Sequence, residues 1–147
     1  MFKNILVPTD GSELSIRAAK LAMALAKATG SKVTAFHVAP PYTFRVYEEY
    51  IPSNFVTMPQ YEENVKKVAE RHLGAIRKLA DAAGISFDGH YTKSDFPAHA
   101  IVEAAEKYGC DSIAMGSHGR GAVGAILLGS ETVKVLASSK LPVIVVH

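Results

Sequence analysis

The chain lacks the sequence features that indicate disulfide-linked, membrane-spanning or nucleic-acid-binding proteins. Its 147 residues include one cysteine, Cys110, and no tryptophan, so no intrachain disulfide is possible. The apolar run at residues 5–7 is too short to predict a signal peptide or a membrane span. Basic residues number 16 and acidic residues 14, so neither sign dominates and we expect no nucleic-acid partner. These absences favour a cytoplasmic protein with one domain over residues 1–147.

Strand-like and helix-like segments alternate along the chain. Short apolar or β-branched runs predict strands, and apolar residues at helical spacing predict helices. The predicted strands are 4–8, 32–38, 86–92, 110–115 and 142–146, and the predicted helices are 13–29, 61–83, 97–109 and 130–138. Because parallel strands need crossover connections, this order predicts a parallel, doubly wound α/β sheet.

Two of the predicted strands contain the most uniformly apolar runs of the chain's strands, at residues 5–7 and 113–115. Strands covered on both faces have this composition, so we expect the two to lie side by side near the centre of the sheet. Ligands of such sheets bind at the carboxyl ends of the strands, where the strand order reverses. The segment 8–10 would then face the segment 116–117 across one crevice.

A glycine-rich segment joins a strand to a helix between residues 115 and 132. Gly116, Gly119 and Gly129 would let backbone N–H groups approach a ligand closely, and Ser130 adds a hydroxyl at the start of a new helix. Residues 119–124 match G-x-G-x-x-G, but they do not follow the first strand, and no Gly-Lys-Ser or Gly-Lys-Thr occurs. We expect an anion site here. The alternative is a mobile loop that joins the strand to the helix and binds nothing.

The spacing that fits is Gly116, two residues, Gly119, nine residues, and Gly129 with Ser130. This G-x2-G-x9-G-[S/T] pattern resembles the ATP-binding branch of the universal stress protein family. Pro-Thr-Asp at residues 8–10 and the closing Leu-Pro-Val-Ile-Val-Val at 141–146 agree with it, so the resemblance covers the whole chain. It implies a three-layer α/β sandwich around a five-stranded parallel sheet, the Rossmann-like fold called adenine nucleotide α hydrolase-like.

The resemblance also implies a site for ATP and Mg²⁺. The backbone of Val38 would meet adenine, Asp10 would hold the metal near the ribose, and Met115 would lie at the edge of the site. The other residues that the resemblance places around ribose and phosphates are Pro8, Thr9, Gly116, Ser117, Gly119, Gly129, Ser130, Glu131 and Thr132.

Glu131 departs from the family pattern, in which a small or apolar residue is more common at this position. A carboxylate there would repel the outer phosphates unless a metal bridges the two or the side chain turns outward. The affinity for a triphosphate depends on which of these holds, whereas the adenosine side of the site is unaffected.

The residues favour binding over turnover, because neither a phosphate-contacting lysine nor a water-positioning base is evident. We expect an ATP-binding protein that acts as a nucleotide-dependent switch or adaptor in stress response, with at most slow hydrolysis and no assigned catalytic residue. One alternative is a Mg²⁺-dependent ATPase or nucleotidyl hydrolase that uses Asp10 or Glu131 together with His118. The other is an interaction module that binds no nucleotide.

Two segments concern partners. Residues 40–61 form an irregular, aromatic-rich insertion, which either packs on the domain or serves as a lid or partner surface. In the sheet order that the family implies, the closing strand 142–146 lies at an edge with unpaired backbone groups. We expect a homodimer through this strand; the alternative is a monomer whose edge is covered by the insertion.

Overall fold

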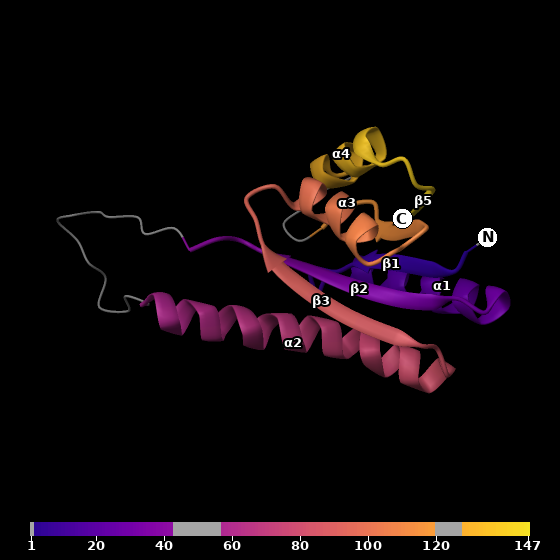
Figure 1. Ribbon diagram of the computed structural model, residues 1–147, viewed down its shortest axis with the longest axis horizontal. Coiled ribbons are helices and arrows are strands. Elements are labelled where there is room, and N and C mark those ends of the chain that lie inside the picture. The colour runs from indigo at the N-terminus through magenta and orange to yellow at the C-terminus, as the bar shows by residue number, and fades with distance from the viewer. Residues whose placement is uncertain (1, 43–56, 120–127) are drawn as a thin grey trace.

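The computed structural model describes residues 2–42, 57–119 and 128–147 (Figure 1). Its strands are β1 (Asn4–Pro8), β2 (Lys32–Ala39), β3 (Phe87–Lys93), β4 (Ser112–Gly116) and β5 (Val143–Val146). Its helices are α1 (Glu13–Thr29), α2 (Met58–Ala83), α3 (Pro97–Lys107) and α4 (Ser130–Ser138). The alternation predicted from the sequence is therefore confirmed.

The strands form one sheet in the order β3-β2-β1-β4-β5, and every neighbouring pair is parallel. β1 is central and pairs with β4 through Ile5 opposite Ser112 and Leu6 opposite Ile113, as the two apolar runs predicted. The chain builds the sheet outward from β1 in one direction and then, from β4, in the other. The switch point therefore lies between the carboxyl ends of β1 and β4.

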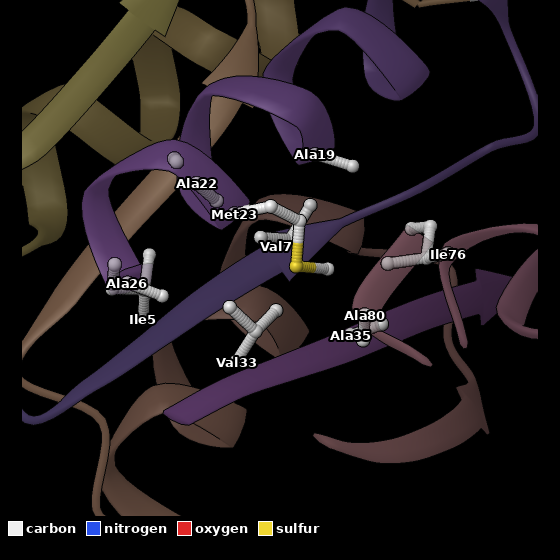
Figure 2. Close-up of a cluster of buried hydrophobic side chains, with 11 residues drawn as sticks. Ile5, Val7, Ala19, Ala22, Met23, Ala26, Val33, Ala35, Ile76 and Ala80 are labelled. Atoms are coloured by element: carbon white, nitrogen blue, oxygen red, sulfur yellow. The ribbon is translucent and has the colours of Figure 1, made fainter. Parts of the chain in front are cut away.

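Helices cover both faces of the sheet, which confirms the predicted three-layer α/β sandwich. Figure 1 shows α2 on one side of the sheet and α3 and α4 on the other. On the first side, Ile5 and Val7 of β1 pack with Met23 of α1 and Ile76 of α2 (Figure 2). On the second side, Leu6 packs with residues of α3 and α4. Alternate residues of the central strand thus face opposite layers.

Local signals set most helix ends. The Ser12 hydroxyl accepts the Ser15 N–H at the start of α1, and Gly30, at φ 71°, ends that helix. α2 starts at Met58, three residues before the predicted start, because Thr57 and Gln60 form a capping box. The predicted insertion 40–61 was therefore too long at its C-terminal end. Residues 43–56 lie outside the described residues, and with them its predicted roles as a lid or an edge cover.

The strand predicted from Cys110 begins two residues later, at Ser112. The Cys110 N–H donates to the Ala105 carbonyl, and the Asp111 N–H donates to the Asn4 carbonyl, so both residues belong to the turn that leaves α3. The Cys110 side chain is buried as predicted, and burial raises the pKa of its thiol.

The two edge strands are β3 and β5. In β3, Asp88, Tyr91 and Lys93 are exposed and the other four residues are half-buried, so the exposed residues do not keep to one face of the strand. Lys32 of β2 forms an ion pair with Asp88. The edge position expected for the closing strand is confirmed. None of the helices within the described ranges is both long and apolar enough to cross a membrane.

Candidate functional site

A cavity of about 450 Å³ opens at the carboxyl ends of β1 and β4. The lining residues come from the end of β1 and the turn after it, from β2, from the starts of α1 and α3, and from residues 115–119 and 129–132. It is lined by Pro8, Thr9, Asp10, Ser15, Phe36, Val38, Pro97, Ile101, Met115, Gly116, His118, Gly119, Gly129, Ser130, Glu131 and Thr132. Its volume is in the range of small-molecule sites.

Every candidate residue from the sequence except Ser117 lines this cavity. Ser117 is buried behind the wall, where its N–H donates to the Val146 carbonyl at 2.8 Å and its own carbonyl accepts the Gly129 N–H. It ties the loop to β5 and to the start of α4. The Gly129 N–H, which we expected to face phosphate, is thereby used within the protein.

The sequence analysis left out five lining residues from its candidate site. Phe36 lies two residues before Val38 on the same face of β2, and Pro97 and Ile101 are one turn apart on α3, so strand and helix periodicity could have found them. Ser15 and His118 are the other two. Together with Val38 and Met115, the three apolar additions give the cavity an apolar part of its lining, which we call the apolar end.

Hydrogen bonds fix the turn between β1 and α1. The Thr9 N–H donates to the Phe36 carbonyl at 2.8 Å, and the Thr9 hydroxyl accepts the Gly11 N–H at 3.1 Å. The Asp10 carboxylate accepts the Ser12 N–H at 2.9 Å. These bonds present Asp10 to the cavity at a defined position.

Two buried histidines support this turn from behind. His37 of β2 donates from Nδ1 to the Thr9 carbonyl at 2.8 Å, because that carbonyl can only accept. The ring of His72, on α2, lies 5.1 Å from that of His37. A Cβ on Gly11 would be 2.1 Å from the His72 ring, so the glycine allows the turn to rest on the imidazole. Sequence reasoning did not pair the two histidines, since 35 residues separate them.

Each of the three motif glycines has a neighbouring group of the protein close to its Cα. A Cβ on Gly119 would lie 2.5 Å from an Asp10 carboxylate oxygen, and one on Gly116 would lie 2.9 Å from the Leu14 side chain. A Cβ on Gly129 would lie 3.1 Å from the His118 Cα. Gly129 has φ −73° and ψ 158°, which any residue adopts. The backbone conformation of Gly129 therefore does not require glycine, and the space at this position is limited by His118 and Ser117 of the protein itself.

The first turn of α4 faces the polar end of the cavity. The first bond within the helix is from the Val133 N–H to the Gly129 carbonyl, so the N–H groups of Ser130, Glu131 and Thr132 precede the helical bonding pattern. Gly129 provides no side-chain cap. The Thr132 hydroxyl, expected at the phosphates, donates instead to the Gly116 carbonyl at 2.9 Å.

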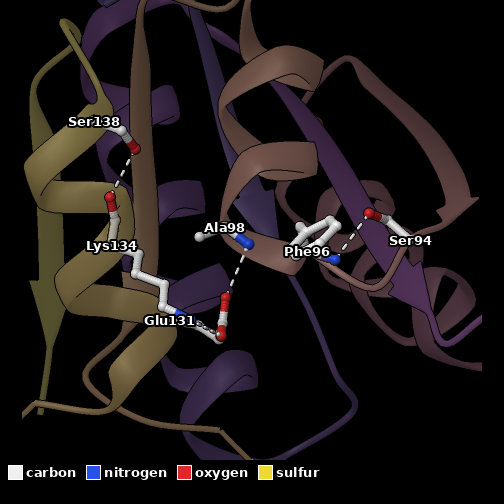
Figure 3. Close-up of polar contacts among 6 residues, drawn as sticks. All are labelled: Ser94, Phe96, Ala98, Glu131, Lys134 and Ser138. Carbon is white, nitrogen blue, oxygen red and sulfur yellow. Dashed lines mark hydrogen bonds and ion pairs between the residues drawn. The ribbon is translucent and has the colours of Figure 1, made fainter.

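Glu131 turns sideways, toward α3. Its Oε2 accepts the Ala98 N–H at 2.9 Å, and its Oε1 lies 3.2 Å from the Lys134 Nζ (Figure 3). The side chain is still part of the cavity wall. Its carboxylate is therefore held by protein groups on both oxygens, although the side chain remains 39% exposed.

Comparisons with known proteins place this geometry in one family. The model of the universal stress protein family matches residues 1–147. The chain belongs to that family. A universal stress protein of Thermus aquaticus, described by its position in the QAH/OAS sulfhydrylase 3′ region, is 34% identical over 147 residues, the full length of both chains.

Solved structures agree with the universal stress protein fold. The structure of the Methanocaldococcus jannaschii protein MJ0577 has a TM-score of 0.82 and 32% identity, covering 99% of this chain and 96% of that one. A universal stress protein in complex with cAMP has a TM-score of 0.70 and 24% identity, covering 99% and 97%. One from Archaeoglobus fulgidus in complex with dAMP has a TM-score of 0.65 and 19% identity, covering 100% and 98%.

Proposed function

We propose that this universal stress protein binds ATP with Mg²⁺ in the cavity between β1 and β4. It then acts as a nucleotide-dependent switch or adaptor in stress response and hydrolyses ATP slowly if at all. The observation that carries the proposal is the pairing, within one cavity, of an apolar end with a helix N-terminus for which the described residues provide no side-chain cap. An adenine base suits the first, and phosphate suits the second.

The apolar end fits a planar base. Phe36, Val38, Pro97, Ile101 and Met115 contribute apolar surface from β2, α3 and β4. The adenine nucleotides bound by two proteins of the same fold, cAMP and dAMP, support a base of this kind. We therefore assign the base to the apolar end and the phosphates to the Ser130 end.

Asp10 fits a metal that arrives with the nucleotide. It supplies one carboxylate, and among the described residues no cluster of three or more His, Cys, Asp or Glu residues could hold an ion by itself. Mg²⁺ commonly binds one or two carboxylates together with phosphate oxygens and water. Asp10 would thus hold Mg²⁺ beside the phosphates, where the metal would offset their charge.

Binding without fast turnover is supported by the lining. Among the described residues, no lysine lines the cavity, and efficient phosphoryl transfer normally uses such a cation. We propose that the protein works in the cytoplasm, in keeping with a chain that has a single cysteine.

The test is calorimetric titration with Mg·ATP and with adenosine. We expect the wild type to bind both, and Asp10→Asn to weaken Mg·ATP while leaving adenosine unchanged, because the amide oxygen can still accept the Ser12 N–H whereas the charge that would hold the metal is lost. Adenosine is thus the internal control for folding. Failure of the wild type to bind either ligand would overturn the proposal.

The second candidate function is a slow Mg²⁺-dependent hydrolase, which the presence of Asp10, His118 and Glu131 in one cavity favours. Phosphate release from ATP by the wild type and by Asp10→Ala separates the two functions. Steady turnover that Asp10→Ala abolishes would favour the hydrolase, whereas bound ATP that persists over many hours favours the switch.

We also propose a homodimer through β5. This strand lies at the sheet edge, and each of its residues, Val143–Val146, is only partly buried in the single chain. An antiparallel partner strand would pair its free edge. Light scattering should give about twice 15.7 kDa for the wild type, and Val145→Lys should shift the mass toward the monomer. A wild-type monomer at micromolar concentration would contradict the dimer.

A further inference from the structure

The side chain of Glu131 crosses from α4 to α3. Figure 3 shows its carboxylate between Ala98 at the start of α3 and Lys134 on its own helix. Glu131 is the second residue of α4, between Ser130 and Thr132, and all three residues line the cavity. A negative charge therefore lies one residue away from the groups to which we assign phosphate binding.

The structure also explains why this charge stays in place. α3 begins at Pro97, which has no N–H, and its cap residue Phe96 makes no side-chain cap bond. The Ala98 N–H is thus the first helical donor, and a carboxylate is the partner that a helix N-terminus favours. Bonded there, Glu131 cannot swing away from a phosphate without leaving α3 uncapped.

Lys134 neutralises this carboxylate only in part. Its side chain is 65% exposed, against 39% for Glu131, so water screens much of the ion pair. Of the residues that the structure describes, no lysine or arginine lines the cavity. The cavity lining thus combines the start of α4 with the carboxylate of Glu131, held by Ala98, in addition to the Asp10 carboxylate that we assign to the metal.

We infer that Glu131 makes this cavity select nucleotides by the charge on their phosphates, accepting AMP and Mg²⁺-bound ATP and disfavouring metal-free ATP. The inference rests on the proposed function, because it concerns the same site. Metal-free ATP carries more negative charge than AMP, and Mg²⁺ removes part of the excess. Repulsion from one fixed carboxylate grows with that charge.

The test is Glu131→Gln, which removes the charge and keeps an oxygen that accepts the Ala98 N–H. AMP, Mg·ATP and ATP with a chelator are titrated into the wild type and the variant at low ionic strength. We expect the variant to bind metal-free ATP about tenfold more tightly. Its affinity for AMP should rise by less than about threefold. Added salt should shrink the difference between the two proteins.

Two further variants act as controls. Glu106→Gln removes the same charge near the far end of α3 and should leave all three affinities unchanged. Lys134→Gln removes the lysine that partly neutralises Glu131, and it should lower the affinity for metal-free ATP more than the affinity for AMP. This change is opposite in sign to that of Glu131→Gln, and the exposed Lys134 is not expected to be needed for folding.

The outcomes separate the inference from the proposed function. A wild type that binds none of the three ligands overturns the proposed function and the inference with it. The wild type could instead bind all three ligands while Glu131→Gln raises the affinities for AMP and for metal-free ATP by the same factor, or raises neither affinity. Charge selection by Glu131 would then be wrong, and the proposed adenine-nucleotide site would be unaffected.

Discussion

Helices α3 and α4 both begin at the cavity, and neither is capped by the side chain of its own N-cap residue. At α3, the Ala98 N–H is bonded to the Glu131 carboxylate of the neighbouring helix. At α4, the first N–H groups face the cavity, and the cap is Gly129.

The difference teaches how one physical requirement is met in two ways. The first N–H groups of a helix have no partner within the helix, and an anion is the favoured acceptor. At α3 the protein supplies that anion from its own chain. We propose that at α4 the phosphate of a bound nucleotide supplies it.

The largest expected effect comes from filling the space at the open helix end. In Gly129→Val, a branched side chain would push against His118, whose Cα lies 3.1 Å from the Cβ position. We expect loss of Mg·ATP affinity by more than about tenfold, with the fold retained by circular dichroism. Gly129→Ala is the graded control and should lose less. Equal affinities for wild type and Gly129→Val would remove α4 from the site.

The next largest effect is expected at the start of α3, where Glu131 accepts the Ala98 N–H. Glu131→Ala removes the only side-chain acceptor that the described residues provide for Ala98, and should lower the free energy of unfolding by about 1 kcal/mol in urea titrations. Ser130→Ala, at the start of the open helix, should change it by less than about 0.5 kcal/mol. Equal losses in the two variants would mean that the two helix ends do not differ.

The smallest effect on the free energy of unfolding should come from Asp88, whose carboxylate pairs with Lys32 and not with the N-terminus of a helix. The hydrogen bond from Lys32 lowers the pKa of Asp88 below its usual value. Its stabilisation is therefore present above the pKa of the unfolded chain and is lost as the pH falls through the lower, folded pKa. Because the pair is exposed, we expect at most about 0.5 kcal/mol.

Unfolding of the wild type and Asp88→Asn between neutral pH and about pH 2 checks this prediction. Asp88→Asn should be slightly less stable at neutral pH, and the difference should vanish in acid. A difference that grows on acidification would reverse the assigned sign. Nucleotide affinity should not change, since Asp88 does not line the cavity.

Local patterns were enough to predict the alternation of strands and helices and the position of the cavity. The apolar runs at 5–7 and 113–115 indicated which strands are neighbours, and the glycine spacing indicated which loop lies at their ends. The early start of α2 was also readable, from Thr57, Pro59 and Gln60. Sequence reasoning overlooked this capping box because the aromatic residues before it suggested a longer insertion.

Contacts between distant side chains could not be predicted in this way. Nothing local indicates that Glu131 bonds to Ala98, 33 residues earlier, or that His72 supports Gly11. The motif glycines were found for a partly different reason from the one the structure gives: each makes room for a neighbouring part of the protein. Spacing identifies such residues, but packing decides their roles.

The most direct test of the account is amide NMR of the ¹⁵N-labelled wild type titrated with AMP and, separately, with adenosine. The account predicts that both ligands shift amides beside the apolar end, such as those of Val38 and Ile101. Only AMP should shift the amides of Ser130, Glu131 and Thr132, because only AMP carries a phosphate to that helix end. An AMP titration that moves the apolar end and leaves these three amides unchanged would contradict it.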